Sequence, residues 1–379
     1  MTIRARSLTA RLAGTVFAGS LMIGAVAVPA TAHADTVGGG WSFATSSVPA
    51  GVASGGELAV DPSRNSVFVT DSDFVMMTKG GTDVTLKLHE ITPKVSVVNT
   101  ASKRPVRSID FSGQPWGVMP FGNVPVVPTP QVPDGIGLDT VHGKVITSNS
   151  HANGITVVDM KAKTTSAANL ISLPLAHPMG VAVTDAGRAY VALNADNSVA
   201  VVNTVTGKQV GSIKNIFMPS FLDVDDSRHR LYVGNADYND KKVNYLTVVD
   251  TRTDKVIKKI ATPSNSRPKV DHATGLVWAA SFDTGKVTII DPDSLRIVGT
   301  IDTKTTPAKV AIDSQRGLLY TSNLQKKTIT VIDTASRKVI ATVSVKGAPH
   351  TVAVDERTGT VYASQHQNGK LTVLTVTRR

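Results

Sequence analysis

The sequence of 379 residues contains no cysteine, few aromatic residues and only one long apolar run. The lack of cysteine excludes disulfides, thiolate metal sites and a thiol nucleophile. Aromatic residues make up 5% of the chain, so the core has to be built of Val, Ile, Leu and Ala. A chain of this length can bury an adequate core without the disulfides that small secreted domains usually need.

The single apolar run lies at the N-terminus, in MTIRARSLTARLAGTVFAGSLMIGAVAVPATAHA. Three arginines precede an apolar stretch at 14–28, and the small-x-small motif AHA at 32–34 is typical of a signal-peptidase site. The apolar stretch is short for a membrane span. We therefore expect residues 1–34 to be a cleaved secretory signal and residues 35–379 to form one secreted domain with no membrane span. Cleavage removes three arginines and no acidic residue, so the formal net charge falls from +11 to +8.

Four short motifs recur with a period of about forty residues, which is the signature of a repeat architecture. One is an apolar-apolar-Asp/Asn step, as in VVD at 248–250 and VID at 331–333. A second is a VAVD-like segment, as at 352–355, and it is followed by a strand such as RLYVGN at 230–235. A run such as KVIATV at 338–343 closes most units. Each unit thus has four short strands rich in β-branched residues and separated by turn residues.

One such unit cannot bury its two faces alone, but radial stacking of several units can. Four strands in some forty residues are typical of a β-propeller blade. We name the strands A to D from the central channel outwards, and seven copies of strands A, B and C are present. The sequence therefore predicts an all-β, seven-bladed propeller of four-stranded blades, which lie approximately at 57–113, 132–174, 177–215, 217–262, 263–304, 305–347 and 348–379.

The last unit ends at strand C, so it lacks a strand D of its own. Residues 41–48, WSFATSSV, form an extended segment that has no A, B or C partner nearby in the sequence. We predict that this segment adds as strand D of the last blade. Such pairing closes the ring and covers a sheet edge that would otherwise be exposed.

The segments RLYVGN, LLYTSN and TVIDTASRKVIAT resemble the YVTN-repeat β-propellers, which include YncE-like periplasmic and secreted proteins. The resemblance covers residues 41–379. It implies the propeller fold, and it implies DNA binding as one alternative because YncE-like proteins are associated with DNA. Seven-bladed propellers that resemble this chain also include lactonases and quinone-dependent dehydrogenases, which implies a propeller enzyme as a second alternative.

Two insertions interrupt the repeat. Residues 71–93 lie between strands B and C of the first blade, and residues 114–133 lie between the first and second blades. Both fall on the face formed by the B–C and D–A loops, which we call the top face. The first insertion is compatible with a hairpin around KGGTD. The second has six prolines in twenty residues, so we expect it to be extended and stiff.

Long loops on a rigid scaffold are where function concentrates. The main interpretation is a secreted, non-enzymatic binding module whose top face, around the two insertions, meets an unidentified protein or cell-envelope ligand. An alternative for Trp116 is that it packs onto the first blade as a lid. The candidate ligand-binding residues are Trp116, Phe121, Asp134, His151, His177 and His350.

The basic surplus supports a different interpretation, in which loops of the opposite, bottom face bind a polyanion such as single-stranded DNA or an anionic cell-wall polymer. Few aromatic residues accompany the basic ones, whereas single-stranded nucleic acid favours stacking platforms. A net charge of this size also serves solubility alone. The candidate polyanion-binding residues are Arg104, Lys144, Arg228, Arg230, Arg337 and Lys338.

No motif in the sequence points to catalysis. It contains neither a G-x-S-x-G elbow nor an H-E-x-x-H motif, and its nine histidines are scattered. We therefore expect no catalytic residues, no bound metal and no cofactor, and we expect the secreted protein to be a monomer.

Overall fold

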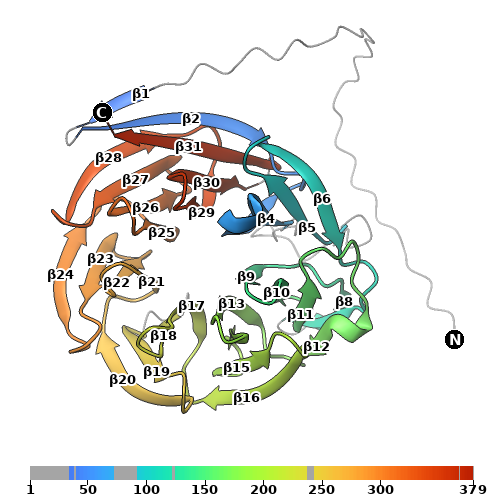
Figure 1. Cartoon of the computed structure of the whole chain (residues 1–379). Coiled ribbons are helices and arrows are strands. Elements are labelled where there is room, and N and C mark those ends of the chain that lie inside the picture. Colours follow the sequence, from blue (N-terminus) through green and yellow to red (C-terminus); the bar gives the residue numbers. More distant parts are fainter. Residues whose placement is uncertain are drawn as a thin grey trace, which may run out of the picture. The chain divides into compact units, whose positions relative to one another are not determined.

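The structure, a computed structural model, describes residues 34–37, 40–71, 92–121, 124–236, 243–366 and 368–378, without the side chains of 34–37, 119–121 and 124–127. Within these ranges the domain is a seven-bladed β-propeller whose antiparallel blades surround a central channel (Figure 1). The predicted fold class is thus confirmed. In the described part of the chain the helices are two short 3-10 turns, η1 (Pro62–Arg64) and η3 (Ala167–Asn169), and no helix there is long and apolar enough to span a membrane.

Each blade is a meander that runs from the channel to the rim. Blade 1 consists of β3 (Gly55–Asp61), β4 (Ser66–Asp71), β5 (Lys94–Asn99) and β6 (Arg104–Asp110). Blade 2 consists of β9 (Gly135–Asp139), β10 (Lys144–Asn149), β11 (Gly154–Asp159) and β12 (Leu170–Ser172). Blade 3 consists of β13 (Pro178–Val183), β14 (Arg188–Leu193), β15 (Ser198–Asn203) and β16 (Lys208–Lys214). Blade 4 consists of β17 (Pro219–Asp225), β18 (Arg230–Asn235), β19 (Tyr245–Asp250) and β20 (Lys255–Ala261). Blade 5 consists of β21 (Ser266–Val270), β22 (Val277–Ser281), β23 (Lys286–Ile290) and β24 (Ile297–Asp302). Blade 6 consists of β25 (Lys309–Asp313), β26 (Leu318–Asn323), β27 (Thr328–Asp333) and β28 (Lys338–Ser344).

Blade 7 combines the two ends of the domain. It consists of β29 (Pro349–Asp355), β30 (Thr360–Gln365), β31 (Lys370–Arg378) and, as its strand D, β2 (Trp41–Pro49). Strand β2 pairs with β31 along all nine residues, from Trp41 opposite Arg378 to Pro49 opposite Lys370. The prediction that residues 41–48 complete the last blade is therefore confirmed. The structure adds a fifth strand that was not predicted, β1 (Ala34–Val37), which pairs outside β2.

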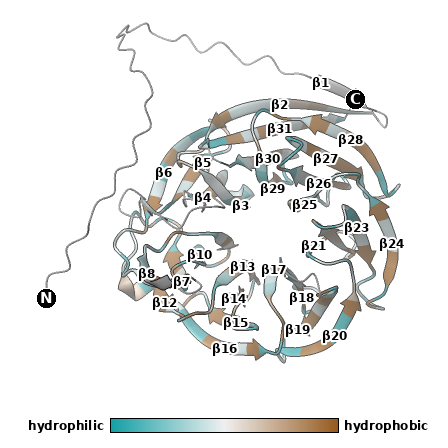
Figure 2. Ribbon diagram, turned by 180° about the vertical axis from the view of Figure 1, so that it is seen from behind, coloured by the Kyte–Doolittle hydropathy of each residue, from teal (hydrophilic) through white to brown (hydrophobic). Residues whose placement is uncertain are grey.

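The core lies between neighbouring blades, which is why strands B and C carry apolar residues on both faces. One position in strand B holds a large side chain that is almost fully buried: Phe68, Ile146, Tyr190, Tyr232, Trp278, Tyr320 and Tyr362. The outermost strands β16, β20 and β24 are mostly exposed, and each contains both hydrophilic and hydrophobic residues (Figure 2). The few aromatic residues are thus concentrated where each blade packs on the next.

Serine residues near the end of strand B fasten blades 2, 6 and 7 to the blade that follows. The Oγ of Ser322 donates to the carbonyl of His350 at 3.0 Å, and the Oγ of Ser364 donates to the carbonyl of Gly56 at 2.6 Å. In both cases the acceptor lies in strand A of the next blade, or at its start. This repeated contact gives the strand motif TSN or ASQ a physical role: it fixes the position at which each inner strand enters the channel wall.

A second fastening lies on the bottom face, in the turns between strands A and B. Asp313 is fully buried and accepts from the backbone N–H of Arg316 at 3.0 Å and from its Nη1 at 3.0 Å. The same guanidinium donates to the carbonyl of Glu356 in the next blade at 2.6 Å. It lies over Gly359, whose φ of +71° and close contact with Arg316 both favour glycine. Arginines of the bottom loops therefore hold blades together.

The proline-rich insertion forms a hairpin that was not predicted. Strands β7 (Gly117–Phe121) and β8 (Val124–Thr129) pair with each other, and the register shifts at Pro120, where the missing N–H cannot join the ladder. The expectation of an extended chain is thus correct, but the sequence did not reveal the pairing. Most of the other insertion, including the predicted hairpin around KGGTD, lies outside the described residues.

Candidate functional site

The central channel is a cavity of about 860 Å³ whose walls are the inner strands of the blades. The antiparallel order places the starts of strands A and the ends of strands B at its top mouth. Because the seven blades repeat one pattern, each position of the inner strand recurs seven times around the mouth. Residues that differ among these equivalent positions are those that the fold does not dictate.

One such set, which we call the channel ring, has very unequal members. The strand registers align Gly135 with Ser148, Phe221 with Gly234, Arg267 with Ala280 and Lys309 with Ser322, which are equivalent pairs. The channel ring consists of Glu57, Gly135, Gly180, Phe221, Arg267, Lys309 and Thr351. In blades 2 and 3 this position is a glycine, whereas three other blades have a charged residue at the same position.

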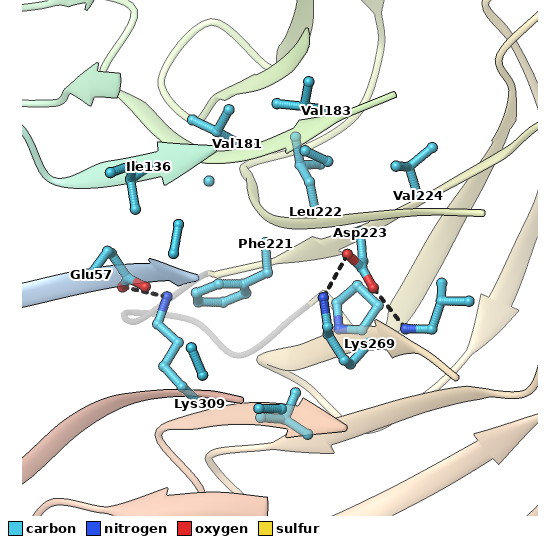
Figure 3. A pocket seen from close by; sticks show the side chains of 18 of the residues that line it. Glu57, Ile136, Val181, Val183, Phe221, Leu222, Asp223, Val224, Lys269 and Lys309 are labelled. Carbon is cyan, nitrogen blue, oxygen red and sulfur yellow. Dashed lines mark hydrogen bonds and ion pairs between the residues drawn. The ribbon is translucent and has the colours of Figure 1, made fainter. Parts of the chain in front are cut away.

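Two charged members of the channel ring, Glu57 and Lys309, form an ion pair across blades (Figure 3). Lys309 Nζ lies 2.7 Å from Glu57 Oε1 and 5.0 Å from the centre of the Phe221 ring. The guanidinium carbon of Arg267 lies 4.5 Å from the centre of the same ring, so Phe221 contacts two cations. Arg267 also donates to the carbonyl of Pro307 at 2.9 Å. A second ion pair, Lys269 to Asp223 at 3.0 Å, lies deeper in the channel.

The pKa of Glu57 reflects the charged groups at the channel mouth. Burial alone would raise the pKa of Glu57, but the charge of Lys309, the proximity of His350 and the hydrogen bonds from Lys309 and Thr351 hold it below its ordinary value. Glu57 is therefore ionised at neutral pH. Burying an ion pair brings little net stability, because the desolvation cost offsets the attraction.

Beside Gly135 lies a polar group that we call the rim cluster, formed by Asp134, Ser150, His151 and His177. Asp134 Oδ2 lies 3.3 Å from His151 Nδ1 and accepts from the Ser150 backbone N–H at 2.9 Å and from the Ser150 hydroxyl. The rings of His151 and His177 are 5.9 Å apart and perpendicular. Three of the predicted candidates, Asp134, His151 and His177, are thus brought together by two neighbouring blades.

The rim cluster separates the protonation behaviour of its two histidines. Burial alone would lower the pKa of His151, but the carboxylate of Asp134 outweighs it and raises that pKa. Burial and the neighbouring charge of His151 lower the pKa of His177. Burial alone would raise the pKa of Asp134, but the charge of His151 and the hydrogen bonds that Asp134 accepts hold it below its ordinary value.

The third histidine candidate, His350, lies apart from the rim cluster, in blade 7. Its ring is 5.8 Å from the ring of His366, which follows the end of β30. Burial is the main cause that lowers the pKa of His350, so this imidazole is neutral at pH 7. The Nδ1 atoms of both rings are buried and have no hydrogen-bond partner among the residues that the structure describes.

Trp116 stands just before the hairpin, and its backbone is held on both sides. Gln131 Nε2 donates to the carbonyl of Pro115 at 3.2 Å, and Asn153 Nδ2 donates to the carbonyl of Val118 at 2.6 Å. At Gly117 a Cβ atom would lie 1.8 Å from the carbonyl oxygen of Ala152, so only glycine fits there. The Trp116 side chain remains 44% exposed, which disfavours the alternative of a buried lid.

These contacts place Trp116 close to the turn that carries His151, since Ala152 follows His151 in the chain. Phe121 lies at the end of β7, and its side chain is outside the described residues. Sequence reasoning missed Glu57, Phe221, Arg267 and Lys309. A residue-by-residue alignment of the inner strands would have found them as the departures from glycine and threonine at one repeat position.

The candidates for polyanion binding are mostly engaged within the fold. Lys144 lies 3.7 Å from Asp159, Arg230 lies 3.4 Å from Asp250, and Arg228 contacts Asp225 at 3.2 Å and Asp293 at 3.1 Å. Arg337 donates to the carbonyl of Val298 at 2.8 Å. Arg104 and Lys338 are exposed at the starts of outer strands. Carboxylates therefore cancel much of the positive field on the bottom face.

In the ranges that the structure describes, no group of three or more histidine, aspartate or glutamate side chains is arranged to hold a metal ion. No protein-family model matches the chain. Two curated relatives, each named uncharacterized protein YncE, come from Salmonella typhi and Salmonella typhimurium. They are 26% identical to this chain over 140 residues, which is 35% of this chain and 38% of theirs.

The chain is a seven-bladed propeller with a partial similarity to YncE. The likeness to YncE is weak and spans well under half the length of either protein. Among solved structures, the Cps50 (Swd1) β-propeller domain of Myceliophteria thermophila matches with a TM-score of 0.64 and 9% identity, over 86% of this chain and 97% of that one. At such identity the match shows the fold alone. Any function therefore has to be argued from the site.

Proposed function

We propose that the protein is an exported binding module that uses the top mouth of its channel, together with Trp116, to hold a ligand or partner of the cell envelope. The observation that carries this proposal is the channel ring. Blades 2 and 3 have glycine at the ring position, so the fold does not require a side chain there. Charged groups in a channel cost desolvation energy, and positions that bear such a cost without structural need are typical of recognition sites.

The way in which the backbone around Trp116 is held supports a binding role for the same face. A tryptophan that is 44% exposed on a backbone fixed at Pro115 and Val118 has little conformational entropy to lose on binding. Tryptophan is also the residue type most enriched among the energetic centres of interfaces. The rim cluster and His350 lie on the same face, so charge, aromatic surface and titratable groups converge there.

The test is co-sedimentation of the purified protein with isolated cell envelopes of the organism that carries this sequence. We expect the wild type to sediment, and both W116A and the double variant E57A/K309A to remain in the supernatant. The double variant removes an ion pair without leaving one charge unpaired. The matched control is D302A/K304A, which removes an exposed ion pair on the outer strand β24 and should sediment normally. Sedimentation of all variants alike would refute the proposal.

The same assay addresses the polyanion alternative. If an anionic polymer is bound through the bottom face, binding will fall steeply with salt and will be lost in R104A/K338A, while W116A remains bound. Export is tested separately by sequencing the N-terminus of the protein recovered from the medium or the envelope. We expect the mature chain to begin at Asp35, which would leave Asp35–Val37 of β1 paired with β2.

A further inference from the structure

Two half-buried histidines of blade 7 lie side by side at the top face. His350 stands at the start of β29 and His366 directly after β30, and their ring centres are 5.8 Å apart. The Nδ1 atom of each ring is buried, and no described residue forms a hydrogen bond with it. Buried polar atoms in native proteins almost always have a hydrogen-bond partner, so two such nitrogen atoms on neighbouring rings call for an explanation. Such a pair therefore suggests a bound species that satisfies both atoms at once.

The chemistry of an imidazole nitrogen without a partner defines what kind of species fits. In the neutral imidazole a protonated Nε2 leaves a lone pair on Nδ1. A neutral imidazole with such a lone pair is the commonest protein ligand of a metal ion.

Both residues are also held in place by their backbones. The carbonyl of His350 accepts from Ser322 Oγ of blade 6 at 3.0 Å, and the N–H of His366 donates to the carbonyl of Ala348 at 3.1 Å. With metal–nitrogen distances of about 2.0–2.1 Å, the centres of two imidazoles on one ion lie roughly 5–6 Å apart. The observed separation of 5.8 Å therefore suits a shared ion with only small adjustments of the rings.

We propose that His350 and His366 form a two-histidine binding site for a divalent transition-metal ion such as Zn²⁺ or Cu²⁺. Two imidazoles favour these ions over Ca²⁺ or Mg²⁺, which prefer oxygen ligands. Two protein ligands leave at least two coordination positions for water or for donor atoms of a ligand in the channel mouth. The nearby Glu57 is already paired with Lys309, so the local charge is close to balanced before the ion binds.

This proposal does not depend on the proposed function, because metal binding is measured with the protein alone. The experiment is isothermal titration calorimetry with ZnCl₂, on protein purified without a polyhistidine tag. We expect one ion per chain, and an affinity at least about tenfold weaker in H350A and in H366A, since even outer-shell partners of a metal ligand account for 10–100-fold. The matched control is H272A, on the bottom face, which should bind like the wild type.

Three further results decide the matter. Melting curves without metal show whether each variant folds, and electron paramagnetic resonance of the Cu²⁺-loaded wild type, which counts nitrogen ligands, should report two. Binding should weaken as the pH falls, because protons compete for the same nitrogens. The proposal is overturned if the wild type binds no Zn²⁺ stoichiometrically, if both H350A and H366A bind normally, or if binding is lost only in H177A, which would assign the ion to the other histidine pair.

Discussion

The carboxylate of Asp134 lies 3.3 Å from Nδ1 of His151, although seventeen residues separate the two in the chain. Asp134 precedes the inner strand of blade 2, and His151 follows the second strand of the same blade. The meander returns to the top face at this point, so the two residues meet by topology. Their contact links the protonation of the channel rim to the fold of a single blade.

Replacing Asp134 with Asn should lower the pKa of His151. The carboxylate is what raises that pKa against the effect of burial, and its removal leaves the burial effect alone. A raised histidine pKa stabilises the fold at pH values below the unfolded value of about 6.5, and this contribution is lost as the pH rises through the folded value. The D134N variant should therefore lose stability mainly below pH 6.5.

The measurement is an NMR titration of the histidine Cε1–H signals, together with melting curves at acidic and basic pH. An unchanged midpoint for His151 in D134N, or an equal loss of stability at all pH values, would show that the two groups are not electrostatically coupled.

Replacing Trp116 with Ala should abolish ligand binding and leave stability nearly unchanged. The side chain is 44% exposed, and surface substitutions usually change the free energy of unfolding by no more than about 0.5 kcal/mol. The contrasting variant is W278A, in which a fully buried indole is removed at a cost of about 3–5 kcal/mol. Chemical denaturation of both variants makes the comparison. A loss of several kcal/mol in W116A would show that Trp116 is a packing residue.

The sequence predicted the ring of blades and its closure because both follow from repetition. Four recurring strand patterns define the blades, and the missing strand D of the last unit leaves an edge that only residues 41–48 are free to fill. The fifth strand β1 and the hairpin of β7 and β8 were not predicted, since neither has a counterpart in another blade. A single pairing without repetition leaves only a local pattern, and here prolines obscure it.

The site was predicted where topology alone decides proximity, as for Asp134, His151 and His177. It was missed where side-chain register decides. Glu57 and Lys309 are 252 positions apart and face each other only because one position of the inner strand recurs around the channel. The pairing of His350 with His366 likewise depends on which way two rings turn, and a sequence pattern does not carry that information.

Replacing Arg316 with Ala should destabilise the propeller, although the residue looks like part of a basic surface. Its guanidinium is the charged partner of the fully buried Asp313 and bridges to the carbonyl of Glu356 in the next blade. Leaving the carboxylate without this partner should cost about 1–3 kcal/mol. The control is R104A, whose side chain is exposed and should change stability by less than about 0.5 kcal/mol. Equal effects of both variants on urea denaturation would contradict the role of Arg316 between blades.

Replacing Phe43 with Ala should weaken the closure of the ring. Phe43 lies in β2, is fully buried and packs in one cluster with Leu374 and Val376 of β31, so it anchors the strand from the N-terminal end of the domain. Removing the aromatic ring of Phe43 should lower the free energy of unfolding by about 3–5 kcal/mol. Release of β2 would also expose the edge of β31, which favours association between chains. We therefore expect F43A to melt at a lower temperature than the wild type and to aggregate on heating, as followed by circular dichroism and light scattering.

The control is the variant T45A, on the same strand but only partly buried, which should melt within a few degrees of the wild type. If F43A melts like T45A, then β2 contributes little to stability, and the propeller is held closed by the contacts between blades 7 and 1.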